Sequence, residues 1–152
     1  MMSTPTVAQL VTAIRAQLSE VVAPAVEDPA AGRVLGMVDH LLQTIAVRAE
    51  HEIEWMVAHV DDVVGLAEEF VDGERGSESI ALALNRYRAE HRRSLSTSAV
   101  TENFALANGV LSAILETTVS DEGPLARRAR DLLRRDVTHA VDIVGDFVLV
   151  PP

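Results

Sequence analysis

The strongest constraint on this chain is a helical repeat of apolar residues that runs without a proline from residue 30 to residue 71. Apolar side chains recur there every three or four residues, which is the spacing of one face of an α-helix. Asp28 followed by Pro29 is typical of a helix start, because aspartate caps the first amides and proline is tolerated at the first helical position. The pattern predicts one helix over residues 29–71, roughly 65 Å long at 1.5 Å per residue.

The rest of the chain shows the same period. Thr6 with Gln9 three residues later forms a capping box, which predicts a first helix from there to Pro24. The glycines and serines of residues 73–79 predict a turn. A third helical stretch covers residues 79–118, and the serines at 94–98 leave open whether it is continuous or broken. After the loop at 120–124 the pattern predicts a last helix.

These elements predict an all-α fold, an antiparallel four- to five-helix bundle with two long central helices, in a single domain over residues 1–152. Short connections place the first helix beside the first half of residues 29–71 and the last helix beside the second half of residues 79–118. The apolar segment 147–150 is expected to pack back onto the bundle.

This topology leaves residues 51–71 and 79–98 as an uncovered hairpin with an apolar stripe, which soluble monomers rarely expose. Either the hairpin folds back near residues 50 and 96, or a second copy covers it. We expect the second arrangement, a homodimer. Its interface residues would be Met56, Val60, Val63 and Phe70.

Composition excludes several classes of protein. The chain has no cysteine, so disulfide scaffolds and thiolate chemistry are excluded. Its formal charge is -10, and residues 1–78 carry all of it, with 14 acids against 4 arginines. That charge disfavours nucleic acid and anionic membranes as partners. With no long apolar run and no signal-peptide pattern, we expect a soluble, cytoplasmic protein without a cofactor.

Histidine–carboxylate pairs at i,i+3 spacing raise the possibility of a metal-binding bundle, since this spacing places two ligands on one helix face. None has the Glu-x-x-His order of carboxylate-bridged metal sites, so a solvated or hydrogen-bonded set is the favoured interpretation. The pairs are His51 with Glu54, His59 with Asp62, and Asp136 with His139.

Nine of the 13 basic residues, all of them arginine, lie in the two short runs 86–93 and 127–135. Arginine binds phosphate and carboxylate groups well, so Arg127, Arg130 and Arg134 are candidates for an anion site. The alternative pairs the arginines with acids, either along their own helix, as for Arg127 and Asp131, or with the acidic helix 29–71 across the bundle or across a dimer.

No catalytic motif is present. The sequence lacks the nucleophile elbow and the glycine-rich phosphate and dinucleotide loops. The serines near His91 are interpreted as helix caps, and Trp55 as a side chain partly buried at a helix crossing. We therefore expect no enzymatic activity.

Three segments carry a resemblance to a known family: Thr4-Pro5-Thr6-Val7-Ala8-Gln9-Leu10-Val11, Val21-Val22-Ala23-Pro24-Ala25, and Arg33-Val34-Leu35 leading into a long helix. Over about its first 70 residues the chain resembles an uncharacterised family of small bacterial helical proteins. Its members are often encoded beside aminoglycoside-phosphotransferase-like kinases and acyl-CoA dehydrogenases. The resemblance implies an accessory or partner role and supplies no functional residue.

Two hypotheses of function follow. The first is a non-catalytic helical interaction protein that self-associates and docks on a neighbouring enzyme. The alternative is a bundle that binds a small ligand (an anion, a nucleotide or acyl-CoA) or a metal.

Overall fold

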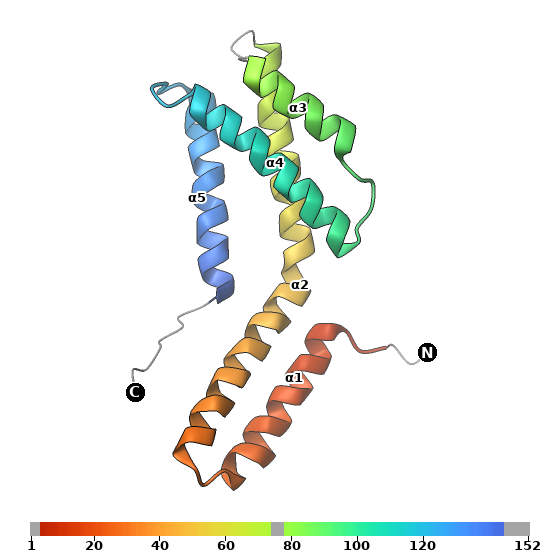
Figure 1. The fold of residues 1–152 in the computed structure, drawn as a ribbon, viewed down its shortest axis with the longest axis vertical. Helices are drawn as coiled ribbons and strands as arrows, with labels where there is room; N and C mark the ends of the chain where they lie inside the picture. Colours follow the sequence, from red (N-terminus) through yellow and green to blue (C-terminus); the bar gives the residue numbers. More distant parts are fainter. Residues whose placement is uncertain (1–3, 74–77, 145–152) are drawn as a thin grey trace. The chain divides into compact units, whose positions relative to one another are not determined.

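The computed structural model describes residues 4–73 and 78–144 and confirms the all-α prediction. Of the described residues, 86% are helical and none lies in a strand. Figure 1 shows the five α-helices in chain order. They are α1 (Val7–Gln17), α2 (Pro29–Asp72), α3 (Glu78–Glu90), α4 (Thr97–Thr117) and α5 (Pro124–Val144). The predicted long helix is thus continuous, and the third stretch is broken into α3 and α4.

The chain divides into two compact units, each described separately below. Unit 1 comprises Met1–Glu52 with Asp142–Pro152, and unit 2 comprises Ile53–Val141. The long helix α2 contributes its first half to unit 1 and its second half to unit 2. Whether both units act as one domain over residues 1–152 stays a prediction.

Unit 1 is built on an antiparallel pair, here called the α1–α2 hairpin, formed by α1 and residues 29–50 of α2 (Figure 1). Its two helix starts are those predicted. The Thr6 hydroxyl accepts from the Gln9 amide, while the Gln9 side chain accepts from the Thr6 amide. The Asp28 carboxylate accepts from the amides of residues 30 and 31. Both caps satisfy amides that no earlier turn can reach.

The end of the first helix differs from the prediction. Regular α-helix ends at Gln17, but a π-turn (Leu18–Val22) and a 3₁₀-turn (Ala23–Ala25) carry the helical path past Pro24. Ala23 keeps helical angles, φ -57° and ψ -42°, because its amide donates to Leu18 across the wider π-turn. The chain leaves the helical region only at Val26.

A short connection, residues 91–96, separates α3 from α4. Ser96 caps α4 by accepting from the Ala99 amide. The Asn103 side chain holds the connection from α4: its Oδ1 accepts from the Arg92 amide and its Nδ2 donates to the Arg92 carbonyl, both at 2.9 Å. The chain therefore reverses here, and α4 packs beside α3 instead of extending it (Figure 1).

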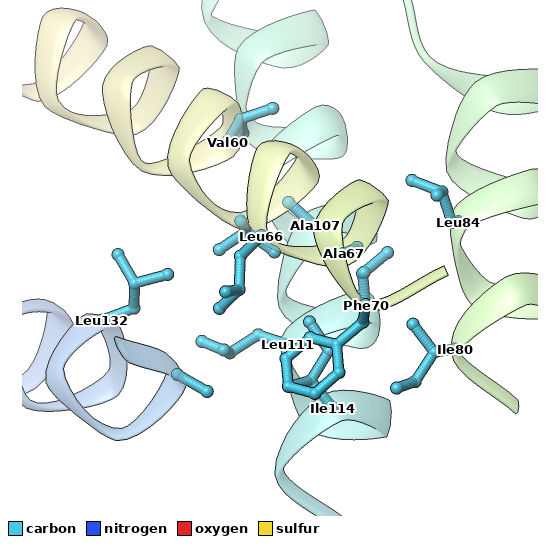
Figure 2. Close-up of a cluster of buried hydrophobic side chains, with 13 residues drawn as sticks. Val60, Leu66, Ala67, Phe70, Ile80, Leu84, Ala107, Leu111, Ile114 and Leu132 are labelled. Carbon is cyan, nitrogen blue, oxygen red and sulfur yellow. The ribbon is translucent and has the colours of Figure 1, made fainter. Parts of the chain in front are cut away.

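The core of unit 2 lies where the second half of α2 meets α3, α4 and α5. Figure 2 shows Phe70 and Leu66 of α2 between Ile80 of α3, Leu111 of α4 and Leu132 of α5. The fully buried side chains come mainly from α2 and α4. They include Val63, Leu66, Ala67 and Phe70 with Ala107, Val110 and Ile114.

This core corrects the predicted topology and the predicted interface. Because the chain reverses at residues 91–96, α5 returns along the second half of α2, where Arg128 pairs with Glu69 and Arg135 with Asp62. The stripe of residues 56–70 is thus covered within the chain. Val60, Val63 and Phe70 are at most 6% exposed, and Met56 is half-buried. The prediction that these residues form an uncovered hairpin was wrong.

Two further predictions lie wholly or partly outside the described residues. The turn expected at 73–79 includes residues 74–77, and the packing of the apolar segment 147–150 belongs to the undescribed end of the chain. None of the helices in the described residues is both long enough and apolar enough to cross a bilayer.

Candidate functional site

The α1–α2 hairpin exposes more apolar surface than its own two helices can cover. Nine large hydrophobic side chains on it and on the π-turn that follows α1 are between 38% and 60% exposed. Three come from α1, one (Val21) from the π-turn, and five from the first half of α2. We call this set the hairpin face: Val7, Leu10, Ile14, Val21, Val34, Met37, Val38, Leu41 and Ile45.

On each helix the members of the hairpin face form a single stripe, from which Val47 (37% exposed) lies about 140° away. At about 100° per residue, the five members on α2, from Val34 to Ile45, fall within an arc of about 100°. The half-buried positions that turn toward α1, such as Asp39 and Leu42, are centred about 110° further round the helix. On α1 the stripe that starts at Val7 is displaced from the half-buried positions by about 90°, in the same rotational sense.

These offsets place both stripes on one side of the hairpin. Each stripe is rotated by a similar angle, in the same sense, from the side of its helix that contacts the other helix. When the two helices are antiparallel, such rotations turn both stripes to the same side of the pair, whereas in parallel helices they would turn them to opposite sides. The hairpin therefore has one continuous apolar face. A two-helix layer of this kind is half of a four-helix bundle.

The size of this face matches that of a protein interface. Completing the burial of each half-exposed side chain is worth about 0.7–1.5 kcal/mol, so the nine amount to about 7–13 kcal/mol per copy. At about 25 cal/mol per Å², that corresponds to about 300–500 Å² of apolar surface. A standard interface buries about 800 Å² per partner, somewhat more than half of it apolar.

A polar contact fixes the two helices of the hairpin to each other. The Arg15 guanidinium donates to both carboxylate oxygens of Asp39, at 2.7 and 2.9 Å, and to the Gln43 side chain at 3.2 Å. The hydrogen bonds from Arg15 lower the pKa of the Asp39 carboxyl below its ordinary value. Both groups remain about a third exposed, so the pair sets orientation more than stability.

Charge is sparse on the hairpin. Residues 1–50 hold five acids and three arginines, a net charge of −2, and Arg15 already neutralises Asp39. Residues 51–78 hold nine acids and one arginine, a net charge of −8. The acidic surplus of the chain is therefore concentrated outside the hairpin.

The structure separates most of the predicted metal ligands. His51 and Glu54 are exposed, and Asp62 pairs with Arg135 at 2.8 Å. His59 is buried, and its Nε2 lies 3.0 Å from the Asn108 Oδ1. Asp136 is half-buried on α5. Within residues 4–73 and 78–144, no three histidine, aspartate or glutamate side chains form a group able to hold a metal ion.

His59 and His139 are instead part of an aromatic cluster that the i,i+3 spacing does not predict. Trp55 stacks on His139 with ring centroids 4.1 Å apart and packs against Phe104 at 5.1 Å. His59 lies 5.0 Å from Phe104 and 6.0 Å from Trp55, measured between ring centroids. The His139 Nε2 is shielded from solvent and has no hydrogen-bond partner in the described residues. This cluster packs α5 against α2 and α4.

The candidate anion-binding arginines do not converge on one point. Arg134 pairs with Asp131 at 2.7 Å, and Arg130 donates to the Asp121 carbonyl. Arg127 is exposed. The expected pair of Arg127 with Asp131 is replaced by the pair of Arg134 with Asp131, because the i,i+3 neighbour is also within reach on the helix surface.

Other arginines cross from one helix to another, as the alternative interpretation predicted. Arg88 of α3 pairs with Glu68 of α2 at 2.7 Å. Arg128 and Arg135 of α5 pair with Glu69 and Asp62 of α2. The arginine runs therefore neutralise three acids in the second half of α2.

Comparison with protein-family models, with curated proteins and with solved structures finds no match. Function must therefore be inferred from this chain's own residues.

Proposed function

We propose that this protein is a non-catalytic helical interaction protein that self-associates through the hairpin face. The observation that carries the proposal is the continuous apolar side of the α1–α2 hairpin, formed by nine half-exposed side chains on two antiparallel helices. Scattered hydrophobic residues are normal on a soluble protein, but a contiguous patch of this size usually binds a partner.

A second copy of this chain is the occupant that fits best. Two identical two-helix layers, placed face to face around a two-fold axis, complete a four-helix bundle and bury both faces at once. The area of the face is sufficient for a dimer. The low net charge of residues 1–50 means that two copies can approach with little repulsion.

The test is to place aspartate in the middle of the face, in the variant Leu41→Asp/Ile45→Asp. Both side chains are about half exposed, at 56% and 48%, so the single chain should fold normally. A dimer contains four of these side chains, and the interface would bury the exposed half of each one. Losing that burial costs about 3–6 kcal/mol of association free energy, which weakens association at least about 100-fold. Sedimentation velocity between about 1 and 100 μM measures the dissociation constant.

Val119→Asp is the matched control, because Val119 is 76% exposed but lies outside the hairpin. We expect it to dimerise like the wild type, and we expect circular dichroism to show the same helicity in both variants. A wild-type chain that stays monomeric at about 100 μM would overturn the proposal. So would dimerisation that is unchanged in Leu41→Asp/Ile45→Asp.

A further inference from the structure

A small cavity in unit 2 lies at the connection between α3 and α4. Its volume is about 250 Å³, and its apolar lining comes from Val57 and Val60 of α2 and Val100 of α4. Tyr87 of α3 also lines it. Val60 and Val100 are at most 6% exposed, so they form a buried apolar floor.

The wall of this cavity is held in place. Residues 92–95 line it, and the two hydrogen bonds between the Asn103 side chain and the Arg92 backbone fix that segment to α4. The Arg92 side chain is itself paired with Glu102 at 3.0 Å. A ligand would therefore meet a preformed wall, which reduces the entropy lost on binding.

Two opposite charges line the same cavity without pairing. Asp61 and Arg93 both belong to the lining, and neither has an ion-pair partner in the part of the chain that the structure describes. Burial, and the negative charge of Asp61, raise the pKa of Tyr87, so its hydroxyl stays protonated and able to donate.

The neighbouring groove between α3 and α4 differs in this respect. It is larger, about 780 Å³, but its lining charges pair with each other: Arg86 with Glu90 and Arg92 with Glu102. Only the smaller cavity combines an apolar floor with one free cation and one free anion among the described residues.

We propose that this cavity binds a small zwitterion with an apolar body, namely an apolar α-amino acid of about the size of leucine. Arg93 pairs with the carboxylate of the ligand and Asp61 with its ammonium group, while Val57, Val60 and Val100 contact the side chain. The volume is below the roughly 300–1,000 Å³ typical of pockets for larger ligands, which favours a small ligand over a nucleotide or an acyl-CoA.

The test measures binding of L-leucine to the full chain by isothermal titration calorimetry. Two analogues of similar shape each lack one charge: 4-methylpentanoate has no ammonium group, and 3-methylbutylamine has no carboxylate. We expect each to bind at least about tenfold more weakly than leucine, because each leaves one charge of the site unpaired. Amide chemical shifts should change mainly at residues 92–103.

Arg93→Gln and Asp61→Asn should each weaken leucine binding at least about tenfold. Both positions are exposed, so these variants should fold. Arg33→Gln and Asp72→Asn remove one exposed charge of the same type elsewhere, and they should bind leucine like the wild type.

Three results would overturn the proposal. The first is no binding of leucine at about 10 mM. The second is unchanged affinity in both Arg93→Gln and Asp61→Asn. The third is equal affinity for leucine and 4-methylpentanoate, which would show that the ammonium group is not recognised.

Discussion

Val63 distinguishes the observed core from an interface between copies. Its side chain is 0% exposed within a single chain, in contact with the cluster that includes Leu66 and Leu111. Val63→Ala removes two methyl groups, worth about 1.6 kcal/mol of burial, and leaves a cavity that adds about 1 kcal/mol. We expect a loss of about 2–3 kcal/mol in the free energy of unfolding, while the dissociation constant for self-association stays unchanged.

Urea unfolding followed by fluorescence is a suitable assay, because Trp55 is the single tryptophan and lies in the aromatic cluster of unit 2. With a slope of about 1–3 kcal/mol per M, the midpoint should fall by about 0.7–3 M. Val34→Ala is the matched control, since Val34 is 59% exposed on the hairpin face. It should weaken self-association and leave the midpoint nearly unchanged. The reverse result, with Val63→Ala affecting association alone, would refute the assignment of Val63 to the core.

Two further experiments, one substitution and one titration, probe unit 2. His139→Phe replaces the shielded Nε2, which has no hydrogen-bond partner in the described residues, and keeps the stack on Trp55. We therefore expect urea unfolding to show stabilisation of about 1 kcal/mol. Destabilisation would show that this nitrogen has a hydrogen-bond partner in the folded protein. Tyr87 is the single tyrosine, so its absorbance titration is unambiguous. Burial, and to a lesser degree the charge of Asp61, raise the pKa of Tyr87, so its titration midpoint should exceed about 10. The stability of the fold should then decrease as the pH rises through that range. A midpoint at or below about 10 would contradict this prediction.

Helix starts could be predicted from the sequence because they depend on local chemistry. The Thr6–Gln9 capping box and the Asp28 cap each involve groups at most three residues apart, and both occur as expected. The continuity of α2 follows equally from the absence of an internal proline. Such signals do not depend on which other helix lies nearby.

The partner of each apolar stripe could not be predicted in this way. The stripe of α2 runs along both halves, and its period shows only that these residues seek cover, not which helix provides it. The decision depends on the break at residues 91–96. Asn103, eleven residues from Arg92, holds that break, and no spacing rule identifies such a contact. Once the chain reverses there, α5 joins the core around Phe70 within unit 2.

The candidate site residues show the same limit. Spacing along one helix suggested that His59 and Asp62 act together, but their partners come from other helices, Asn108 of α4 and Arg135 of α5. The cavity charges Asp61 and Arg93 are 32 residues apart in the sequence and share no motif. Only the three-dimensional structure brings them to one cavity.

The distribution of charge favours a dimer through the hairpin over one through residues 51–71. The second half of α2 is strongly acidic, and two copies meeting there would have brought like charges together. In the structure, arginines of α3 and α5 pair with that helix inside one chain, at Glu68, Glu69 and Asp62. Each exposed pair adds at most about 1 kcal/mol, but together they reduce the repulsion within α2 and direct α3 and α5 onto it. The hairpin face belongs instead to residues 1–50, whose net charge is only −2.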